Sequence, residues 1–317
     1  MQELIVSFNV LFAMKRILIA GGTGMIGREL TRVMLEQEAS VFILSSSARN
    51  DSRDEQGIYR LKWNPEKREI SEQAFGHFDA VINLAGHTIN CPWTTSNRRK
   101  ILQSRVQSAG FLTDMILSGK IQTKLYISSS AIGIYSNTGE VKTEEHPKGK
   151  DFLSEVCQSW EHASEALIQA NVRRVIFRLP VVLSNKGGML PAILPLARLT
   201  GGVVAGSGKQ HMSFVHATDV ARAVSFAIED THAEGTYNLS APEIPTALDF
   251  AEDLAHAIGR KLFITRTPAF IFRLVLGARS GLLLDDQQID GSKLRSLGFQ
   301  YQFNSIDEAL SNLYPRR

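Results

Sequence analysis

The sequence predicts an α/β fold, a doubly wound parallel sheet with a smaller C-terminal α/β lobe. Two observations carry this prediction. Short, nearly continuous apolar runs alternate with segments of helical periodicity, as is typical of parallel strands covered on both faces. A glycine-rich turn also joins the first apolar run directly to a helical segment. Because crossovers between parallel strands are right-handed, such a chain winds helices onto both faces of its sheet.

The elements of the main sheet follow from the apolar periodicity. The first strand begins at Arg16, and a helix is predicted from Met25 to about Glu36. Further strands are predicted at 41–44, 80–86, 125–128 and 174–182, with helices at 96–118 and 152–170.

After about Asn185 the pattern changes, because glycine pairs and prolines interrupt the chain. The predicted elements beyond this point are a strand at 211–216, a helix at 218–229, a strand at 235–239, a helix at 246–259 and an apolar helix from 267 to 276. Leu282-Leu283-Leu284 is interpreted as packing surface, too short for a membrane.

Three segments are predicted. Residues 1–13 are an apolar N-terminal extension, expected to be poorly ordered or to reflect an upstream start, since Met14 precedes the first strand as an initiator would. The extension lacks the basic start of a secretory signal, which predicts a cytoplasmic protein. Residues 14–240 form the sheet domain, and 265–313 form a small C-terminal domain.

Composition favours neither a nucleic-acid nor a membrane partner. The 35 basic and 32 acidic residues leave a formal net charge of +3, with no isolated basic block. The two cysteines, Cys91 and Cys157, are far apart, and the eight histidines show no ligand spacing, so no metal site is expected.

The glycine-rich turn predicts a dinucleotide site. Gly21, Gly24 and Gly27 are spaced three apart, with a strand before them and a helix after them. Glycine permits the tight turn and lets the backbone approach a pyrophosphate, while the helix N-terminus favours phosphate charge. The alternative is a plain glycine turn.

The end of the second strand favours NADP(H) over NAD. A site for NAD places an acid there to hold the ribose 2′-hydroxyl, but Ser45 and Ser46 occupy this position and no carboxylate follows until Asp51. Hydroxyls with Arg49 or Arg53 nearby suit a 2′-phosphate better. The alternative is a solvated polar loop.

Seven motifs occur in order along the chain: Gly21-Gly22-Thr23-Gly24-Met25-Ile26-Gly27, Asn83-Leu84-Ala85-Gly86, Trp93, Ser104-Arg105-Val106, Ser128-Ser129-Ser130-Ala131-Ile132-Gly133 with Tyr135, Phe152-Leu153-Ser154-Glu155-Val156-Cys157 with Trp160-Glu161, and Ser213-Phe214-Val215-His216 with Asp219. Together they resemble the atypical short-chain dehydrogenase/reductases of the sugar-nucleotide epimerase-like family. The resemblance implies a Rossmann fold of the extended type. Residues 265–313 resemble the family's C-terminal domain of unknown function, including Gln287-Gln288-Ile289 and Leu297-Gly298-Phe299.

The resemblance also implies a set of cofactor contacts. Arg105 would reach the cofactor from the helix at 96–118, and Val182 would line its nicotinamide end. For Leu84, Ala85 and Val182 the alternative is ordinary core, and for Arg105 a surface arginine. The implied NADP(H) residues are Gly21, Thr23, Gly24, Met25, Ile26, Gly27, Ser45, Ser46, Leu84, Ala85, Arg105 and Val182.

The usual acid–base pair of the superfamily is absent. Where a Tyr-x-x-x-Lys is expected, the chain has Phe152 and Val156, and neither can exchange a proton. Three substitutes are candidates: Ser130 to polarise a carbonyl, Tyr135 as another phenol, and His87 as a proton carrier near neutral pH. Each also has an ordinary structural interpretation.

Two hypotheses of function follow. The chain is either an NADP(H)-dependent oxidoreductase or epimerase-like enzyme on a small polar carbonyl or sugar-nucleotide-like substrate, or a catalytically silent protein that senses NADP(H). A homodimer is expected by analogy with such domains.

Overall fold

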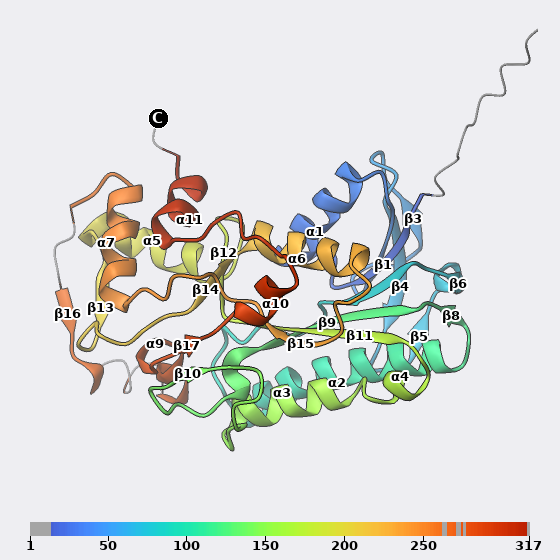
Figure 1. Cartoon of the computed structure of the whole chain (residues 1–317), viewed down its shortest axis with the longest axis horizontal. Coiled ribbons are helices and arrows are strands. Elements are labelled where there is room, and N and C mark those ends of the chain that lie inside the picture. The colour runs from blue at the N-terminus through green and yellow to red at the C-terminus, as the bar shows by residue number, and fades with distance from the viewer. Residues whose placement is uncertain (1–13, 262–264, 271–273, 275–276, 316–317) are drawn as a thin grey trace, which may run out of the picture.

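The computed structural model describes residues 14–261, 265–270, 274 and 277–315. A nine-stranded sheet lies at its centre (Figure 1). Within it, β1 (Arg16–Ala20) has β7 (Ala80–Asn83) on one side and β2 (Ser40–Ser45) on the other. From β15 to β4 all neighbours in this sheet are parallel. The strands run in the order β15 (Gly235–Asn238), β11 (Arg173–Leu179), β9 (Leu125–Ala131), β7 (Ala80–Asn83), β1 (Arg16–Ala20), β2 (Ser40–Ser45), β4 (Tyr59–Asn64) and β3 (Ser52–Arg53), with β5 (Glu69–Ile70) paired to β4.

Helices cover both faces of this sheet, which confirms the predicted doubly wound architecture. Figure 1 shows α1 (Met25–Glu36) and α6 (Ala217–Glu229) over one face, and α2 (Thr95–Leu117), α3 (Phe152–His162) and α4 (Ala166–Gln169) over the other. Each face has its own apolar core, one around Leu30 and Val224 and the other around Leu112 and Tyr126. The chain places β2 and β4 on one side of β1 and the later strands, from β7 to β15, on the other side. Such folds bind ligands in the crevice where the strand order changes, here at the carboxyl ends of β1 and β7.

The remaining elements form a smaller, mainly helical region at one end of the sheet (Figure 1). Its helices are α5 (Met189–Thr200), α7 (Ala247–Ala257), α9 (Gly281–Leu284) and α11 (Ile306–Leu313), whereas α10 (Ser292–Ser296) lies against β15 of the main sheet. Two-stranded pairs link distant parts of the chain: β6 (Gly76–His77) with β8 (Ile121–Gln122), β10 (Val141–Lys142) with β17 (Gln288–Ile289), β12 (Val181–Leu183) with β14 (Phe214–His216), and β13 (Val203–Ala205) with β16 (Thr265–Thr267).

The C-terminal residues complete the core of earlier elements. Leu294, Phe299 and Tyr301 belong to the apolar cluster beneath α6. The buried Asp219 carboxylate, in the first turn of α6, accepts backbone N–H bonds from Gln302 at 2.8 Å and from Phe303 at 3.1 Å. The C-terminal region therefore contributes to the packing of α6.

Several details differ from the sequence prediction. The strand predicted at 80–86 ends at Asn83. The predicted helix at 152–170 is interrupted after His162. The Arg174 guanidinium donates hydrogen bonds to the Glu161 carbonyl and the Ser164 hydroxyl, so the Glu161 carbonyl is no longer free to continue the helix. The predicted strand at 174–182 divides at Pro180, since proline cannot donate to the ladder, and β12 leaves the main sheet to pair with β14.

Two further differences concern a strand that is shorter than predicted and a strand that was not predicted. The strand predicted at 211–216 is regular only from Phe214, with single bridges at His211 and Met212. Strand β4 was not predicted, because Arg60 and Lys62 interrupt its apolar residues on the exposed face.

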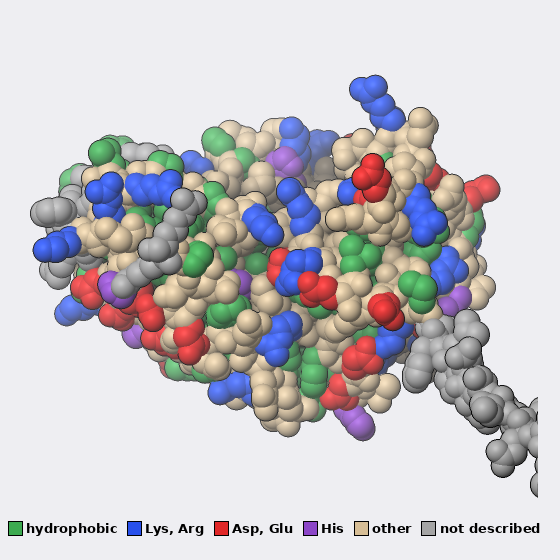
Figure 2. Space-filling view, turned by 90° about the horizontal axis from the view of Figure 1, so that it is seen from above, with side chains coloured by type: hydrophobic (Ala, Val, Ile, Leu, Met, Phe, Trp, Pro, Cys, Tyr) green, Lys and Arg blue, Asp and Glu red, His purple; other side chains and the backbone are tan. Residues whose placement is uncertain are grey.

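Some predictions fall outside the described residues. The N-terminal extension at 1–13 lies outside them entirely, as do parts of the apolar helix predicted at 267–276. Among the described positions of that predicted helix, 269, 270 and 274 are helical. In the described part, no helix is both long and apolar enough to cross a membrane. On the face shown in Figure 2, acidic and basic side chains are interspersed among polar and apolar ones.

Candidate functional site

The glycine turn lies against the end of β7 with no room for side chains. Gly21 has φ +80°, and a Cβ there would lie 2.7 Å from the carbonyl carbon of Leu84 and 2.8 Å from the nitrogen of Ala85. A Cβ on Gly27 would lie 2.4 Å from the Gly21 oxygen. Glycine is thus required at both positions by close backbone approach.

The N-terminus of α1 is open to a ligand. Gly24 precedes the helix and donates its N–H to the Gly21 carbonyl at 3.0 Å, but no side chain caps the helix. The first-turn N–H groups of Met25, Ile26 and Gly27 have no partner within the helix, and together with the helix dipole they favour a phosphate. Thr23 is exposed beside them.

Met25 joins this turn to the segment that follows Val182. A Cβ on Gly187 would lie 3.2 Å from the Met25 Cβ, and one on Gly188 would lie 3.2 Å from the Met25 sulfur. Val182 itself is half-buried and pairs with Val215. The structure therefore brings the glycine turn, Leu84, Ala85 and the 182–188 segment to the same end of the sheet.

The serines at the end of β2 differ in their surroundings. Ser45 is buried, with its hydroxyl 2.9 Å from that of Ser47, whereas Ser46 is exposed. Arg49 is exposed, and no carboxylate pairs with it within the described residues.

Arg28 is a basic residue near this site that the sequence reasoning missed. It is exposed on the first turn of α1, and its Nε donates to the Thr23 carbonyl at 2.8 Å. No carboxylate of the described chain forms an ion pair with it. An arginine directly after Gly27, the last glycine of the motif, was the signal that could have identified it.

Arg105 is largely buried and holds the loop after β7. Its Nη1 donates to the carbonyls of His87 and Ile101, both at 3.0 Å, and its guanidinium lies 5.1 Å from the Trp160 ring centroid. Its Cζ would be 3.1 Å from a Cβ on Gly86. The surface-arginine alternative is wrong, since Arg105 fixes the loop that carries His87.

His87 is positioned by its backbone. Its N–H donates to the Ser104 hydroxyl at 2.8 Å, while its carbonyl accepts from Arg105. The side chain is half-buried.

The Ser130 hydroxyl is buried and has no hydrogen bond of normal geometry in the described structure. Its neighbour is the thiol of Cys157, which lies beside Ser130 and Ala131, and burial raises the pKa of this thiol to about 12. At neutral pH the side chain of Cys157 is therefore uncharged, and Ser130 has an unused donor.

The helix residues that contact the serine strand lie one position later than predicted. Leu153 packs where a Cβ on Gly133 would be 3.2 Å away, and Cys157 lies beside Ser130. Phe152 instead contacts Trp93, with ring centroids 5.4 Å apart. We therefore place the Tyr-x-x-x-Lys positions at 153 and 157. The correction leaves the conclusion unchanged, because neither leucine nor a neutral thiol replaces that pair.

Tyr135 is engaged inside the protein. It is 2% exposed, its hydroxyl donates to Asn238 Oδ1 at 2.7 Å, and it accepts from Arg178 Nη1 at 2.8 Å. Burial raises the pKa of the Tyr135 phenol even though Arg178 lowers it. This arrangement argues against a catalytic phenol and favours the packing interpretation.

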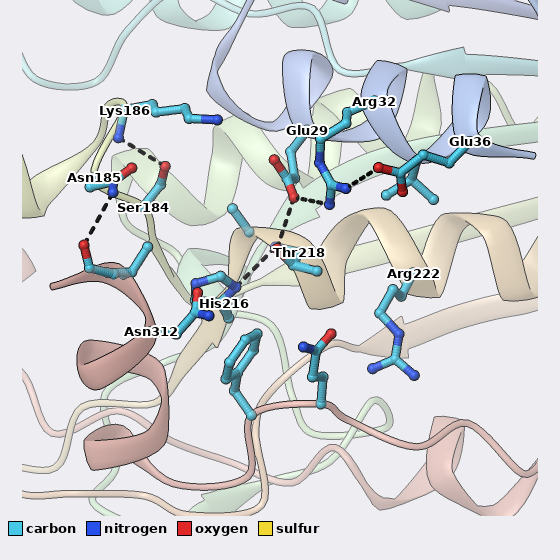
Figure 3. A pocket seen from close by; sticks show the side chains of 15 residues that line it. Glu29, Arg32, Glu36, Ser184, Asn185, Lys186, His216, Thr218, Arg222 and Asn312 are labelled. Carbon is cyan, nitrogen blue, oxygen red and sulfur yellow. Dashed lines mark hydrogen bonds and ion pairs between the residues drawn. The ribbon is translucent and has the colours of Figure 1, made fainter. Parts of the chain in front are cut away.

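A polar pocket of about 560 Å³ lies between α1, α6 and α11 (Figure 3). His216 is part of its wall. It is buried at the N-terminus of α6, where Nδ1 accepts the Thr218 N–H at 3.2 Å. Burial lowers the pKa of the His216 imidazole from 6.5 to about 4.

The lowered pKa of His216 predicts an acid-dependent loss of stability. Above pH 6.5 the imidazole is neutral in both states, whereas between 6.5 and about 4 only the unfolded state takes up the proton. The free energy of unfolding should therefore fall over this interval, by at most about 3 kcal/mol. Denaturant titrations at several pH values check this. His216→Asn keeps a capping oxygen and should lack this part of the slope; equal slopes in both proteins would contradict it.

The change in strand order at β1, the open N-terminus of α1 and the close-packed glycines of the turn between them define a nucleotide-binding α/β protein of the short-chain dehydrogenase/reductase fold. Comparison with known proteins specifies this class further. The chain belongs to the NAD-dependent epimerase/dehydratase family, whose model matches residues 17–240. Residues 267–313 match a domain of unknown function, DUF1731.

Relatives and solved structures agree with this assignment. An epimerase family protein of Staphylococcus haemolyticus is 33% identical over 95% of this chain and 99% of its own. The human epimerase family protein SDR39U1, crystallised with NADPH, has a TM-score of 0.85 and 28% identity, covering 94% of this chain and 99% of its own. A nucleoside-diphosphate sugar epimerase from Corynebacterium glutamicum has a TM-score of 0.75 and 26% identity, covering 95% and 59%.

Proposed function

We propose that the protein binds NADP(H) and catalyses a reductase or epimerase-like reaction on a small polar carbonyl compound. The single observation that carries the cofactor assignment is the pair of exposed arginines, Arg28 and Arg49, near a second strand that ends without a carboxylate. Guanidinium groups form charge-assisted bonds with phosphate. The similar human protein that was crystallised with NADPH supports the same choice.

The cofactor would be held mainly by the backbone. The first-turn N–H groups of α1 would bind the pyrophosphate, and Ser46 with Arg28 and Arg49 would bind the 2′-phosphate. Leu84, Ala85 and Val182 would lie along the cofactor. When bound, the nicotinamide supplies the hydride chemistry.

The chemical step would depend on the Ser130 hydroxyl. Its donor is unused and could hydrogen-bond a substrate carbonyl oxygen as negative charge develops there. His87, half-buried on the loop that Arg105 holds, is our candidate for proton delivery.

The cofactor assignment is tested by comparing NADPH with NADH. We expect NADPH to raise the melting temperature more than NADH, because only NADPH carries the 2′-phosphate. Arg49→Gln and Arg28→Gln should each weaken NADPH binding about tenfold and leave NADH binding unchanged. Lys67→Gln, in the exposed turn between β4 and β5, is the matched control. Equal shifts by the two cofactors would show the 2′-phosphate argument to be wrong.

The catalytic assignment is tested by NADPH oxidation across small carbonyl compounds. Ser130→Ala and His87→Ala should lower the rate, while Tyr135→Phe should change stability more than rate. Activity that survives the first two substitutions would remove both candidates.

A regulatory protein that senses NADP(H) is the second candidate. It is favoured by the neutral thiol of Cys157 at the position of the superfamily's lysine. Tight NADPH binding without turnover of any carbonyl compound would establish this alternative.

A further inference from the structure

The polar pocket between α1, α6 and α11 is the one drawn in Figure 3. Arg32 comes from α1, Lys186 from the segment after β12, and His216 and Arg222 from α6 and its N-terminus. At about 560 Å³ the pocket has the size of a small-molecule site.

Most charges in this pocket are already paired. Arg32 lies between Glu29 at 2.6 Å and Glu36 at 2.5 Å, and Arg222 lies 3.1 Å from the buried Asp219 carboxylate. Lys186 differs, because no carboxylate of the described chain lies within ion-pair distance of its ammonium group. It lies near enough to Glu29 to lower the pKa of that carboxyl group, whose hydrogen bonds go to Arg32 and Thr218. Lys186 is therefore the basic side chain of this lining that has no ion-pair partner within the described residues.

The wall also holds one unused hydrogen-bond donor. Because His216 Nδ1 accepts the backbone N–H of Thr218, the neutral ring carries its proton on Nε2. Nε2 is buried and has no partner in the described structure, although His216 is only 3% exposed. A buried polar atom without a partner indicates a missing ligand or water.

We propose that this pocket is a binding site for a small anion with a carboxylate or phosphate group. Lys186 supplies the countercharge and His216 Nε2 donates a hydrogen bond to the anion. Arg32 and Arg222 remain in their ion pairs with Glu29, Glu36 and Asp219. None of its groups lies on the glycine turn, although Lys186 directly precedes Gly187 and Gly188, which lie against Met25.

The experiment follows the imidazole nitrogens of His216 by NMR in the full-length, 15N-histidine-labelled protein. Inorganic phosphate and succinate are titrated separately, with sodium chloride at equal ionic strength as the reference. We expect a saturable shift of the Nε2 resonance with at least one of the two anions and none with chloride. The anion that saturates identifies the ligand group. Shifts no larger than those with chloride for both anions would overturn the proposal.

Variants locate the binding. Lys186→Gln should weaken the anion about tenfold, while Lys67→Gln should leave its affinity unchanged. His216→Asn retains an N-cap oxygen, so it should fold, and it both assigns the resonance and removes the donor. Unchanged affinity in Lys186→Gln would contradict the site.

Repeating the titration with saturating NADPH separates this pocket from the glycine turn, which can itself bind phosphate. The His216 signal should respond equally in both conditions. If NADPH fails to bind at all, the proposed function is wrong, but the His216 titration still tests the pocket. A response that NADPH abolishes would place the anion at the cofactor site and overturn the proposal.

Discussion

Gly27→Ala should abolish NADPH binding and lower the free energy of unfolding by about 3 kcal/mol. The added Cβ would lie 2.4 Å from the Gly21 oxygen and 2.5 Å from the Gly22 Cα. Both neighbours are backbone atoms, so the clash is relieved only by moving the turn away from α1. That movement disturbs the first-turn N–H groups that would bind phosphate. Denaturant unfolding and NADPH titration measure the two effects.

Gly110→Ala is the matched control for this substitution. Gly110 lies within α2, and a Cβ there would meet nothing within 4 Å. Alanine should therefore stabilise the protein by about 0.5–1 kcal/mol, because glycine is unfavourable inside a helix. If Gly27→Ala bound NADPH as tightly as the unaltered protein, the glycine turn would not be the phosphate site.

Arg178→Met should lower the free energy of unfolding by about 3–5 kcal/mol. Arg178 is 4% exposed, and its Nε and Nη2 donate to the two Glu161 carboxylate oxygens at 2.9 and 2.8 Å. It also donates to Tyr135 and to the Glu144 carbonyl. Methionine preserves volume but leaves a buried carboxylate without its partner. Chemical denaturation with matched baselines gives the size of the loss.

Two further variants show whether the loss of stability in Arg178→Met comes from the unpaired Glu161 carboxylate. Lys62→Gln removes one member of an exposed pair with Glu69 at 4.0 Å and should cost less than about 0.5 kcal/mol. The double variant Arg178→Met/Glu161→Leu removes both buried charges and should recover part of the stability. If the double variant is less stable than Arg178→Met, the loss does not come from an unpaired carboxylate.

The sequence predicted the parts of the molecule that depend on local pattern. The glycine spacing identified the turn, and the apolar runs identified the central strands, because buried parallel strands are apolar on both faces. The half-exposed strand β4 was missed, since Arg60 and Lys62 break its pattern. Likewise, the interruption after His162 depends on Arg174, which comes from a different strand.

The site was predictable only in part, for the same reason. Tyr135 stood out as a phenol near the serine strand, but its partners Arg178 and Asn238 are distant in sequence, so its burial could not be anticipated. The Tyr-x-x-x-Lys positions were predicted one residue too early on α3. Which residues of α3 face the serine strand depends on how the helix is rotated about its axis, and packing sets that rotation. The unpaired Lys186 and the His216 donor became visible only once α1, α6 and α11 were placed together.

The contacts between α6 and the C-terminal residues bear on how the chain is made. All seven parallel strands of the main sheet precede residue 240, so the sheet can assemble while later residues are still being synthesised. Until Leu294, Phe299 and Tyr301 follow, the apolar surface that they cover stays open, and the Asp219 carboxylate lacks the N–H donors of Gln302 and Phe303. Exposed apolar surface of this kind promotes aggregation and engages chaperones. The nascent protein is therefore most vulnerable between the completion of its sheet and the arrival of these residues.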